Sequence, residues 1–176
     1  MNNASIIPVD EEIKFADDEI IVSKTDLKGE IKYANEVFCR LAEMDENDVI
    51  GKPHNVIRHP DMPRSIFYFL WEAIKAKKEI FAYVKNMSST GKYYWVYAHV
   101  TPTVNEAGQI TGYHSSRRSV EPAKLSIVSD LYKKLLSLEE GHSNRKEGMT
   151  AAIEYFNNFL KQQNKTYDDY IWSIGE

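Results

Sequence analysis

The segment Tyr93-Tyr-Trp-Val-Tyr-Ala-His-Val100 constrains the fold more than any other part of the sequence. Side chains alternate between the two faces of a strand. One face would carry Tyr94, Val96, Ala98 and Val100, and the other Tyr93, Trp95, Tyr97 and His99. Both faces are semi-apolar, so we expect a strand that is covered on both sides. The face with the smaller residues suits the lining of a cavity, and the aromatic face suits packing against a helix or a second subunit.

Turn residues divide the flanking sequence into further strands and short helices. We predict strands over residues 19–24, 30–34, 79–87, 92–102 and 109–118, the first two forming a hairpin. Helical segments are predicted over residues 36–44, 45–50 and 63–77, with Pro63 as the first residue of the longest helix. This order indicates an α+β fold, a five-stranded antiparallel sheet with short helices on one face. A concave ligand site would lie between helix and sheet.

After residue 120 the periodicity becomes helical. One apolar stripe ends at Gly141, a second starts near an Asn144 and Glu147 pair that resembles a capping box, and a last helix is expected over residues 167–174. These stripes could pack back on the domain or pair with a partner helix. We therefore divide the chain into a tail or cap helix over residues 1–18, a sensor domain over 19–119 and a helical extension over 120–176.

Composition excludes several classes of function. The formal charge of −4 and the lack of a basic stripe argue against nucleic-acid binding. The single cysteine rules out an intramolecular disulfide and fits the cytoplasm. We find no signal peptide, no membrane-spanning segment, no catalytic motif and no metal-ligand spacing, so an enzyme is not expected.

The string Arg58-His-Pro-Asp-Met-Pro63 is rigid and polar. The two prolines fix φ and bias the residues before them towards extended conformations. Arg58 offers five donors to a phosphate or a ring carbonyl, and His59 can donate to a ligand or titrate near neutral pH. A simpler interpretation is that Asp61 caps the following helix while Arg58 forms a surface ion pair.

Several short motifs occur in the order expected for one known family. They are Tyr33-Ala-Asn35, Gly51-Lys-Pro-His-Asn55, Arg58-His-Pro-Asp-Met-Pro63, Trp71, Lys85-Asn86, Gly91, Tyr94-Trp-Val96 and Gly112-Tyr113. Over residues 19–119 they resemble the FAD-binding PAS sensor domain of Aer-type receptors, which mediate energy taxis (aerotaxis). The chain shows no transmembrane helix or methyl-accepting hairpin, which resembles the soluble PAS component of a bipartite energy-taxis receptor.

The resemblance implies a redox sensor that binds FAD non-covalently. It assigns the cofactor-binding residues as Asn35, Arg58, His59, Asp61, Trp71 and Asn86. It also implies a cytoplasmic protein that signals by contact with a membrane-bound chemoreceptor of the methyl-accepting type, and that could form a homodimer. No catalytic residue and no metal site are expected.

Other interpretations remain open at this point. Asn35 could only cap a helix, Trp71 could only fill the core, and Asn86 could only serve a turn. A haem-binding PAS gas sensor would need an axial ligand among His54, His59, His99 and His114. A cofactor-free interaction module is the third possibility. Cys39 lacks the sequence context of light-sensing flavin domains, so photochemistry at this cysteine is not expected.

Overall fold

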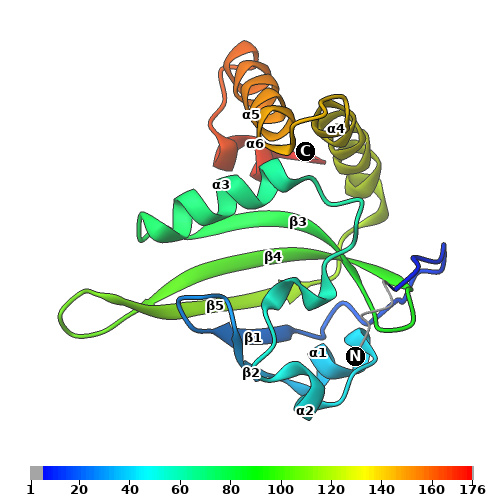
Figure 1. Cartoon of the computed structure of the whole chain (residues 1–176), viewed down its shortest axis with the longest axis vertical. Coiled ribbons are helices and arrows are strands. Elements are labelled where there is room, and N and C mark those ends of the chain that lie inside the picture. Colours follow the sequence, from blue (N-terminus) through cyan, green and yellow to red (C-terminus); the bar gives the residue numbers. More distant parts are fainter. Residues whose placement is uncertain (1–5, 176) are drawn as a thin grey trace.

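The five strands form one antiparallel sheet in the order β2-β1-β5-β4-β3 (Figure 1). The computed structural model describes residues 6–175. The strands are β1 (Ile21–Thr25), β2 (Ile31–Ala34), β3 (Ile80–Met87), β4 (Tyr93–Val104) and β5 (Ile110–Arg118). The predicted α+β fold with a five-stranded sheet is confirmed. Strand β4 runs two residues beyond the predicted end, because Val104 still pairs with Ile110 of β5.

The helices that follow β2 match the predicted order, with one addition. They are α1 (Glu36–Ala42), α2 (Glu46–Val49) and α3 (Arg64–Lys75), and the addition is η1, a 3-10 turn over His54–Ile57. The prediction that Pro63 is the first helical residue was wrong by one position. Proline fixes φ but leaves ψ free, and Pro63 has ψ 137°, so its backbone is extended and the helix begins at Arg64.

Alternation along β4 is as predicted. Tyr94, Val96, Ala98 and Val100 are buried on one face, and the aromatic residues between them are half-buried on the other. Helix α3 lies across the face with the smaller residues (Figure 1). On the opposite face Trp95 meets Tyr132, with their ring centroids 6.1 Å apart. The two faces of β4 therefore have different neighbours.

Strand β3 forms one edge of the sheet, and its outer carbonyls are covered by three different elements. The backbone N–H of His59 donates to Lys85 O at 3.4 Å. The hydroxyls of Tyr132 and Tyr167 donate to Tyr83 O at 2.6 Å and to Phe81 O at 3.0 Å. A sheet edge covered in this way offers few free groups for pairing with another strand.

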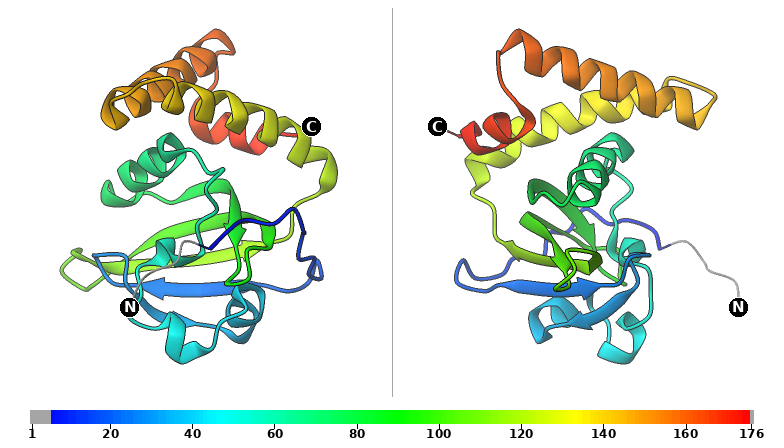
Figure 2. Two further views of the ribbon diagram at one scale, coloured as in Figure 1. Left: turned by 45° about the vertical axis from the view of Figure 1, so that its right-hand side comes forward. Right: turned by 90° about the vertical axis from the view of Figure 1, so that its left-hand side faces the viewer.

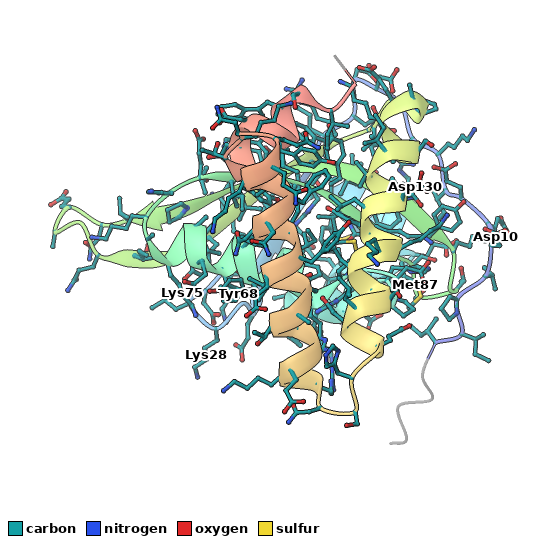
Figure 3. The ribbon with its side chains drawn as sticks, turned by 90° about the horizontal axis from the view of Figure 1, so that it is seen from above. Asp10, Lys28, Tyr68, Lys75, Met87 and Asp130 are labelled. Carbon is teal, nitrogen blue, oxygen red and sulfur yellow. The ribbon has the colours of Figure 1, made fainter. Side chains whose placement is uncertain are left out.

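Helices α4 (Pro122–Glu140), α5 (Arg145–Gln162) and α6 (Tyr167–Ser173) form a separate layer over α3 and the β3 edge (Figures 1 and 2). Seen from above, α4 and α5 run side by side as a hairpin (Figure 3). Their apolar stripes are buried within this chain, at positions that include Val128, Leu135, Phe156 and Leu160. The stripes therefore pack back on the domain.

The helix caps of this layer follow from local sequence. The side chain of Asn144 accepts from the backbone N–H groups of Lys146 and Glu147, as the predicted cap requires. A full reciprocal capping box occurs instead at Thr166 and Asp169, before α6.

The N-terminal segment is extended over the residues that the structure describes. Residues 6–18 contain no helix, and Glu12 forms a parallel bridge with Tyr93 at the start of β4. The bridge is made by Ile13 N–H donating to Tyr93 O at 2.7 Å and Tyr93 N–H donating to Glu11 O at 2.9 Å. Within residues 6–175, no helix combines the length and apolar composition needed to cross a membrane.

Candidate ligand-binding cavity

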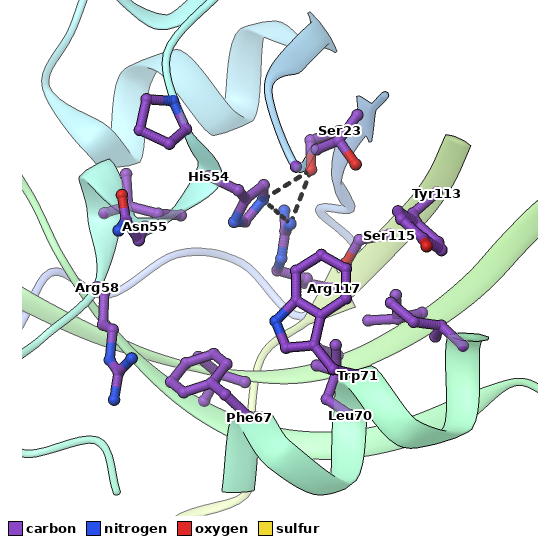
Figure 4. Close-up of a pocket in the computed structure, with 18 of the residues that line it drawn as sticks. Ser23, His54, Asn55, Arg58, Phe67, Leu70, Trp71, Tyr113, Ser115 and Arg117 are labelled. Atoms are coloured by element: carbon purple, nitrogen blue, oxygen red, sulfur yellow. Dashed lines mark hydrogen bonds between the residues drawn. The ribbon is translucent and has the colours of Figure 1, made fainter. Parts of the chain in front are cut away.

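A cavity of about 300 Å³ lies between α3 and the inner face of the sheet (Figure 4). Its lining comes from every strand of the sheet except β2, together with η1, α3 and the turn between β1 and β2. The lining residues are Ser23, Thr25, Lys28, Gly29, Pro53, His54, Asn55, Ile57, Arg58, Phe67, Leu70, Trp71, Ile74, Val84, Asn86, Ala98, Val100, Tyr113, His114, Ser115 and Arg117. Lys28, Pro53 and Asn55 are exposed and mark its opening.

The walls of the cavity are mostly apolar. Phe67, Leu70, Trp71 and Ile74 follow the three- and four-residue spacing that places side chains on one face of α3. Opposite them, Val84, Ala98 and Val100 on the sheet are small side chains that leave space. A helix face opposite a sheet encloses a slot, which suits a planar ring system.

Trp71 closes one end of this slot. Its ring meets Tyr113 edge to face, with the centroids 5.5 Å apart. The turn between β1 and β2 lies against the same ring, since a Cβ added at Gly29 would be 3.6 Å from the indole. Gly29 has a φ of +81°, which other residues rarely adopt, so glycine serves both the turn and the close approach.

A buried arginine lies deep in the cavity. Arg117 Nη2 donates to Ser23 Oγ at 2.7 Å and to His54 Nε2 at 2.6 Å, and Ser23 Oγ is 3.1 Å from the same imidazole nitrogen (Figure 4). Among residues 6–175, no carboxylate lies within ion-pair distance of Arg117. A buried charge without a counter-charge is costly, so this guanidinium is suited to an anionic or acceptor-rich ligand.

Burial sets the charge states in this cluster. It lowers the pKa of Arg117 to about 10, so the guanidinium stays protonated at neutral pH. Burial, together with the charge of Arg117, lowers the pKa of His54 to about 3, so the imidazole is neutral. Burial also raises the pKa of the Tyr94 phenol, against a smaller opposing effect of the Arg117 charge.

Three polar atoms of the lining are buried without a hydrogen-bond partner among the described residues. They are Asn86 Nδ2, Ser115 Oγ and Arg117 Nη1. Buried polar groups nearly always have a partner, and leaving one unsatisfied costs about 1–3 kcal/mol. Two donors and a hydroxyl therefore suit a ligand with hydrogen-bond acceptors along one edge. A flavin ring has such an edge, so the residues present fit this group.

Three of the six predicted cofactor residues line the cavity: Arg58, Trp71 and Asn86. The Arg58 guanidinium lies 4.2 Å from the centroid of Phe67 and donates to Met62 O at 2.9 Å. Burial lowers the pKa of Arg58, with the charge of Glu139 opposing. Arg58 is therefore part of the cavity wall and not a surface ion pair.

Asn35 does not line the cavity. Its Oδ1 accepts from Phe38 N–H at 3.1 Å and from Val22 N–H at 3.0 Å, and its Nδ2 donates to Ile20 O at 2.8 Å. These three bonds cap α1 and tie it to the start of β1. The capping role predicted for Asn35 is confirmed.

His59 and Asp61 also lie outside the cavity lining. The Nδ1 atom of His59 accepts from Asp61 N–H at 3.1 Å, and Asp61 pairs with Lys85 of β3 at 2.7 Å. Burial and Lys85 lower the pKa of His59, while Asp61 opposes this. The two residues hold the segment before α3 against the edge of β3. The proposed cap of α3 by Asp61 is not observed, because Glu139 makes those contacts.

Sequence reasoning missed the polar cluster of Ser23, His54, Ser115 and Arg117 as a unit. Alternation places Tyr113, Ser115 and Arg117 on one face of β5, but Ser115 and Arg117 are polar, so nothing in the sequence indicates that this face is the inward one. Among the four histidines considered as haem ligands, His54 and His114 line the cavity, whereas His59 and His99 do not. Within residues 6–175, no group of three or more metal-binding side chains is present.

Comparison with known proteins agrees with this architecture. A sequence model of the family described as PAS fold matches residues 31–117. The sheet and its helices have the PAS fold. Within the PAS fold, the cavity lies between helix α3 and the inner face of the sheet.

The chain is similar in sequence to the aerotaxis receptor of Escherichia coli strain K12. The two are 38% identical over 120 residues, which cover 68% of this chain and 24% of the receptor. The chain thus spans about a quarter of the length of that relative.

Two solved structures share the PAS fold with this chain. The blue-light photoreceptor Aureochrome1 LOV, in its light state, has a TM-score of 0.55 at 18% identity and covers 66% of this chain and 91% of its own. A light-oxygen-voltage domain from a study of a flavin analogue has a TM-score of 0.53 at 16% identity. It covers 69% of this chain and 86% of its own. At these identities the likeness is one of fold alone. Cys39, the single cysteine, lies on α1 and does not line the PAS cavity.

Proposed function

We propose that the PAS cavity binds FAD non-covalently and that the chain is a redox sensor for energy taxis. The observation that carries this proposal is the buried charge of Arg117, which has no carboxylate partner among residues 6–175 and an Nη1 that is unsatisfied there. It lies in a slot with apolar walls. A ligand that fits must be flat and apolar on its faces and rich in acceptors along one edge, and a flavin ring has these properties.

The volume of the cavity limits how FAD could bind. About 300 Å³ is at the lower end of small-molecule sites and is too small for the whole dinucleotide. We infer that the ring occupies the slot and that the adenosine diphosphate extends through the opening near Lys28 and Asn55. Lys28 at the opening and Arg58 in the wall are the cations available for the phosphates.

A bound flavin supplies reversible uptake of electrons and protons. Arg117 keeps its positive charge throughout the physiological pH range, so it would stabilise negative charge gained at the ring edge. Asn86 would donate its amide hydrogens to the same edge. His54 accepts from Arg117, so its role would be to orient the guanidinium. Trp71 and Phe67 would cover the ring and exclude water.

Asn35, His59 and Asp61 would support the site indirectly. Asn35 fixes α1 against β1, while His59 and Asp61 fix the backbone that carries Arg58. Replacing His59 would then weaken FAD binding because Arg58 is displaced. No direct contact between His59 and the ligand would be lost.

The proposed output is a contact with a membrane-bound chemoreceptor of the methyl-accepting type, in the cytoplasm. Similarity to the aerotaxis receptor of Escherichia coli supports a role in taxis. A bipartite arrangement, with a sensing chain and a separate receptor, is part of this proposal. A change of charge in the cavity would be transmitted as a population shift of the elements that form its walls.

A ligand titration tests the cofactor. Apo-protein is mixed with FAD, FMN or haem, and binding is followed by absorption and by quenching of flavin fluorescence. We expect saturable 1:1 binding of FAD. Arg117→Met should weaken this binding, and Arg118→Met is its matched control, since Arg118 is the exposed neighbour of Arg117. Binding of haem with a Soret band, or of no ligand, would contradict the proposal and favour a gas sensor or an interaction module.

A further inference from the structure

Glu139 connects the C-terminal hairpin to the helix that walls the cavity. This carboxylate is buried, with 4% of the residue exposed. Its two oxygens accept from the backbone N–H groups of Arg64 at 2.9 Å and Ser65 at 2.7 Å, and from Arg64 Nε at 3.2 Å. The N-cap residue of α3, Pro63, has no polar side chain, so a residue from α4 supplies the cap.

The other side of Glu139 is in close contact with α5. A Cβ added at Gly148 would lie 2.2 Å from the backbone oxygen of Glu139, so the two helices meet here at backbone distance. Such a contact leaves no room for α4 to shift at this point unless α5 moves with it. Movement of Glu139 would therefore be passed to α5.

The first turn of α3 is also part of the cavity wall. Phe67 lines the cavity and lies under the guanidinium of Arg58, at 4.2 Å. The negative charge of Glu139 acts on Arg58 and raises the pKa of its guanidinium, against the larger effect of burial. One short chain of contacts thus runs from the cavity through the start of α3 to Glu139 and the hairpin.

We propose that Glu139 is the positioning residue that couples the cavity to the C-terminal hairpin. A ligand that moves the first turn of α3, or changes the charge near Arg58, would alter how readily α4 and α5 open. The hairpin would then be the element that reports the state of the cavity. The identity of the ligand in this inference rests on the proposed function, whereas the mechanical connection does not.

Hydrogen exchange of the apo-protein tests the mechanical connection. Glu139→Gln removes the charge and one acceptor but keeps the size, and Glu140→Gln is the control at an exposed neighbouring position. We expect exchange of residues 149–156 in α5 to rise about tenfold together with that of residues 64–67, and Glu140→Gln to match the native protein. If exchange rises only in residues 64–67, Glu139 is no more than a helix cap and the proposal fails.

Adding FAD tests the coupling to the ligand. In the native protein, FAD should slow exchange of residues 149–156 several-fold, and in Glu139→Gln this effect should disappear although the spectrum shows bound FAD. Unchanged hairpin exchange in native protein that has bound FAD would overturn the inference. If FAD does not bind, the flavin assignment fails, and the apo-protein comparison alone decides whether Glu139 makes the connection.

Discussion

Arg117 Nη2 lies 2.6 Å from His54 Nε2, and this contact determines the tautomer of the histidine. A guanidinium can only donate, so Nε2 must accept and the ring proton must be on Nδ1. The histidine is therefore neutral when it orients the arginine, in agreement with its lowered pKa of about 3.

His54 should make the stability of the protein depend on pH. In the unfolded chain His54 takes up a proton near pH 6.5, whereas in the folded protein it stays neutral down to about pH 3. Between these values the unfolded state binds more protons, so the free energy of unfolding falls as the pH falls. From pH 7.5 to 5.5 we expect His54 to contribute a loss of about 1.4 kcal/mol.

Urea unfolding of the native protein and of His54→Gln at both pH values measures this contribution. Gln can still accept from Arg117 but does not titrate. The variant should lose less stability on acidification than the native protein. Equal losses would show that His54 takes up a proton over the same pH range in the folded protein as in the unfolded chain. The contact with Arg117 would then not be the one described.

Replacing Arg117 should separate ligand binding from stability. Arg117→Met removes a buried charge that has no counter-charge in the described part of the chain, so the free energy of unfolding without ligand should change by less than about 1 kcal/mol. The affinity for FAD should fall about 10- to 100-fold, since hydrogen bonds to charged groups contribute about 1.5–3 kcal/mol. Unaltered FAD affinity in Arg117→Met, measured by fluorescence titration, would remove the main argument for the flavin.

Asn35 and Arg58 should respond to substitution in opposite ways. Asn35→Ala removes a helix cap and should lower the free energy of unfolding by about 1–2 kcal/mol, without changing the FAD affinity of the folded protein. Arg58→Gln should weaken FAD binding about tenfold with a smaller loss of stability. Urea unfolding and FAD titration of both variants check this. Loss of binding in a fully folded Asn35→Ala variant would place Asn35 in the site itself.

The tyrosine at the β3 edge should stabilise the fold. Tyr132→Phe leaves Tyr83 O without its donor and should lower the free energy of unfolding by about 1–2 kcal/mol. Tyr155 lies on the exposed side of the hairpin, so Tyr155→Phe is the matched control and should stay within about 0.5 kcal/mol of the native protein. Identical urea midpoints for both variants would mean that this hydroxyl contributes nothing to the edge.

Periodicity predicted the strands and the long helix, because their apolar residues repeat at distinct spacings. It could not predict the inward position of Arg117. Arg117 and Arg118 are adjacent and chemically identical, and only pairing of Arg117 with Ile21 and Ala98 decides which one faces the cavity. Since Ser115 is polar as well, the inward face of β5 carries no apolar pattern that would set its phase.

Motif similarity singled out a segment whose residues have different surroundings in the structure. Arg58 points to the cavity, whereas His59 and Asp61 contact the edge of β3, and this division depends on tertiary packing. The residue that caps α3 could not be predicted from the neighbouring sequence either. It comes from Glu139, more than seventy residues away in the sequence, whereas capping rules consider only neighbouring residues.

The absorption spectrum of the protein as purified from cells, with FAD present throughout, tests the central claim most directly. We predict a yellow protein with the bands of an oxidised flavin, and release of free FAD on denaturation. A colourless protein that remains folded, or one with a Soret band, would contradict the account.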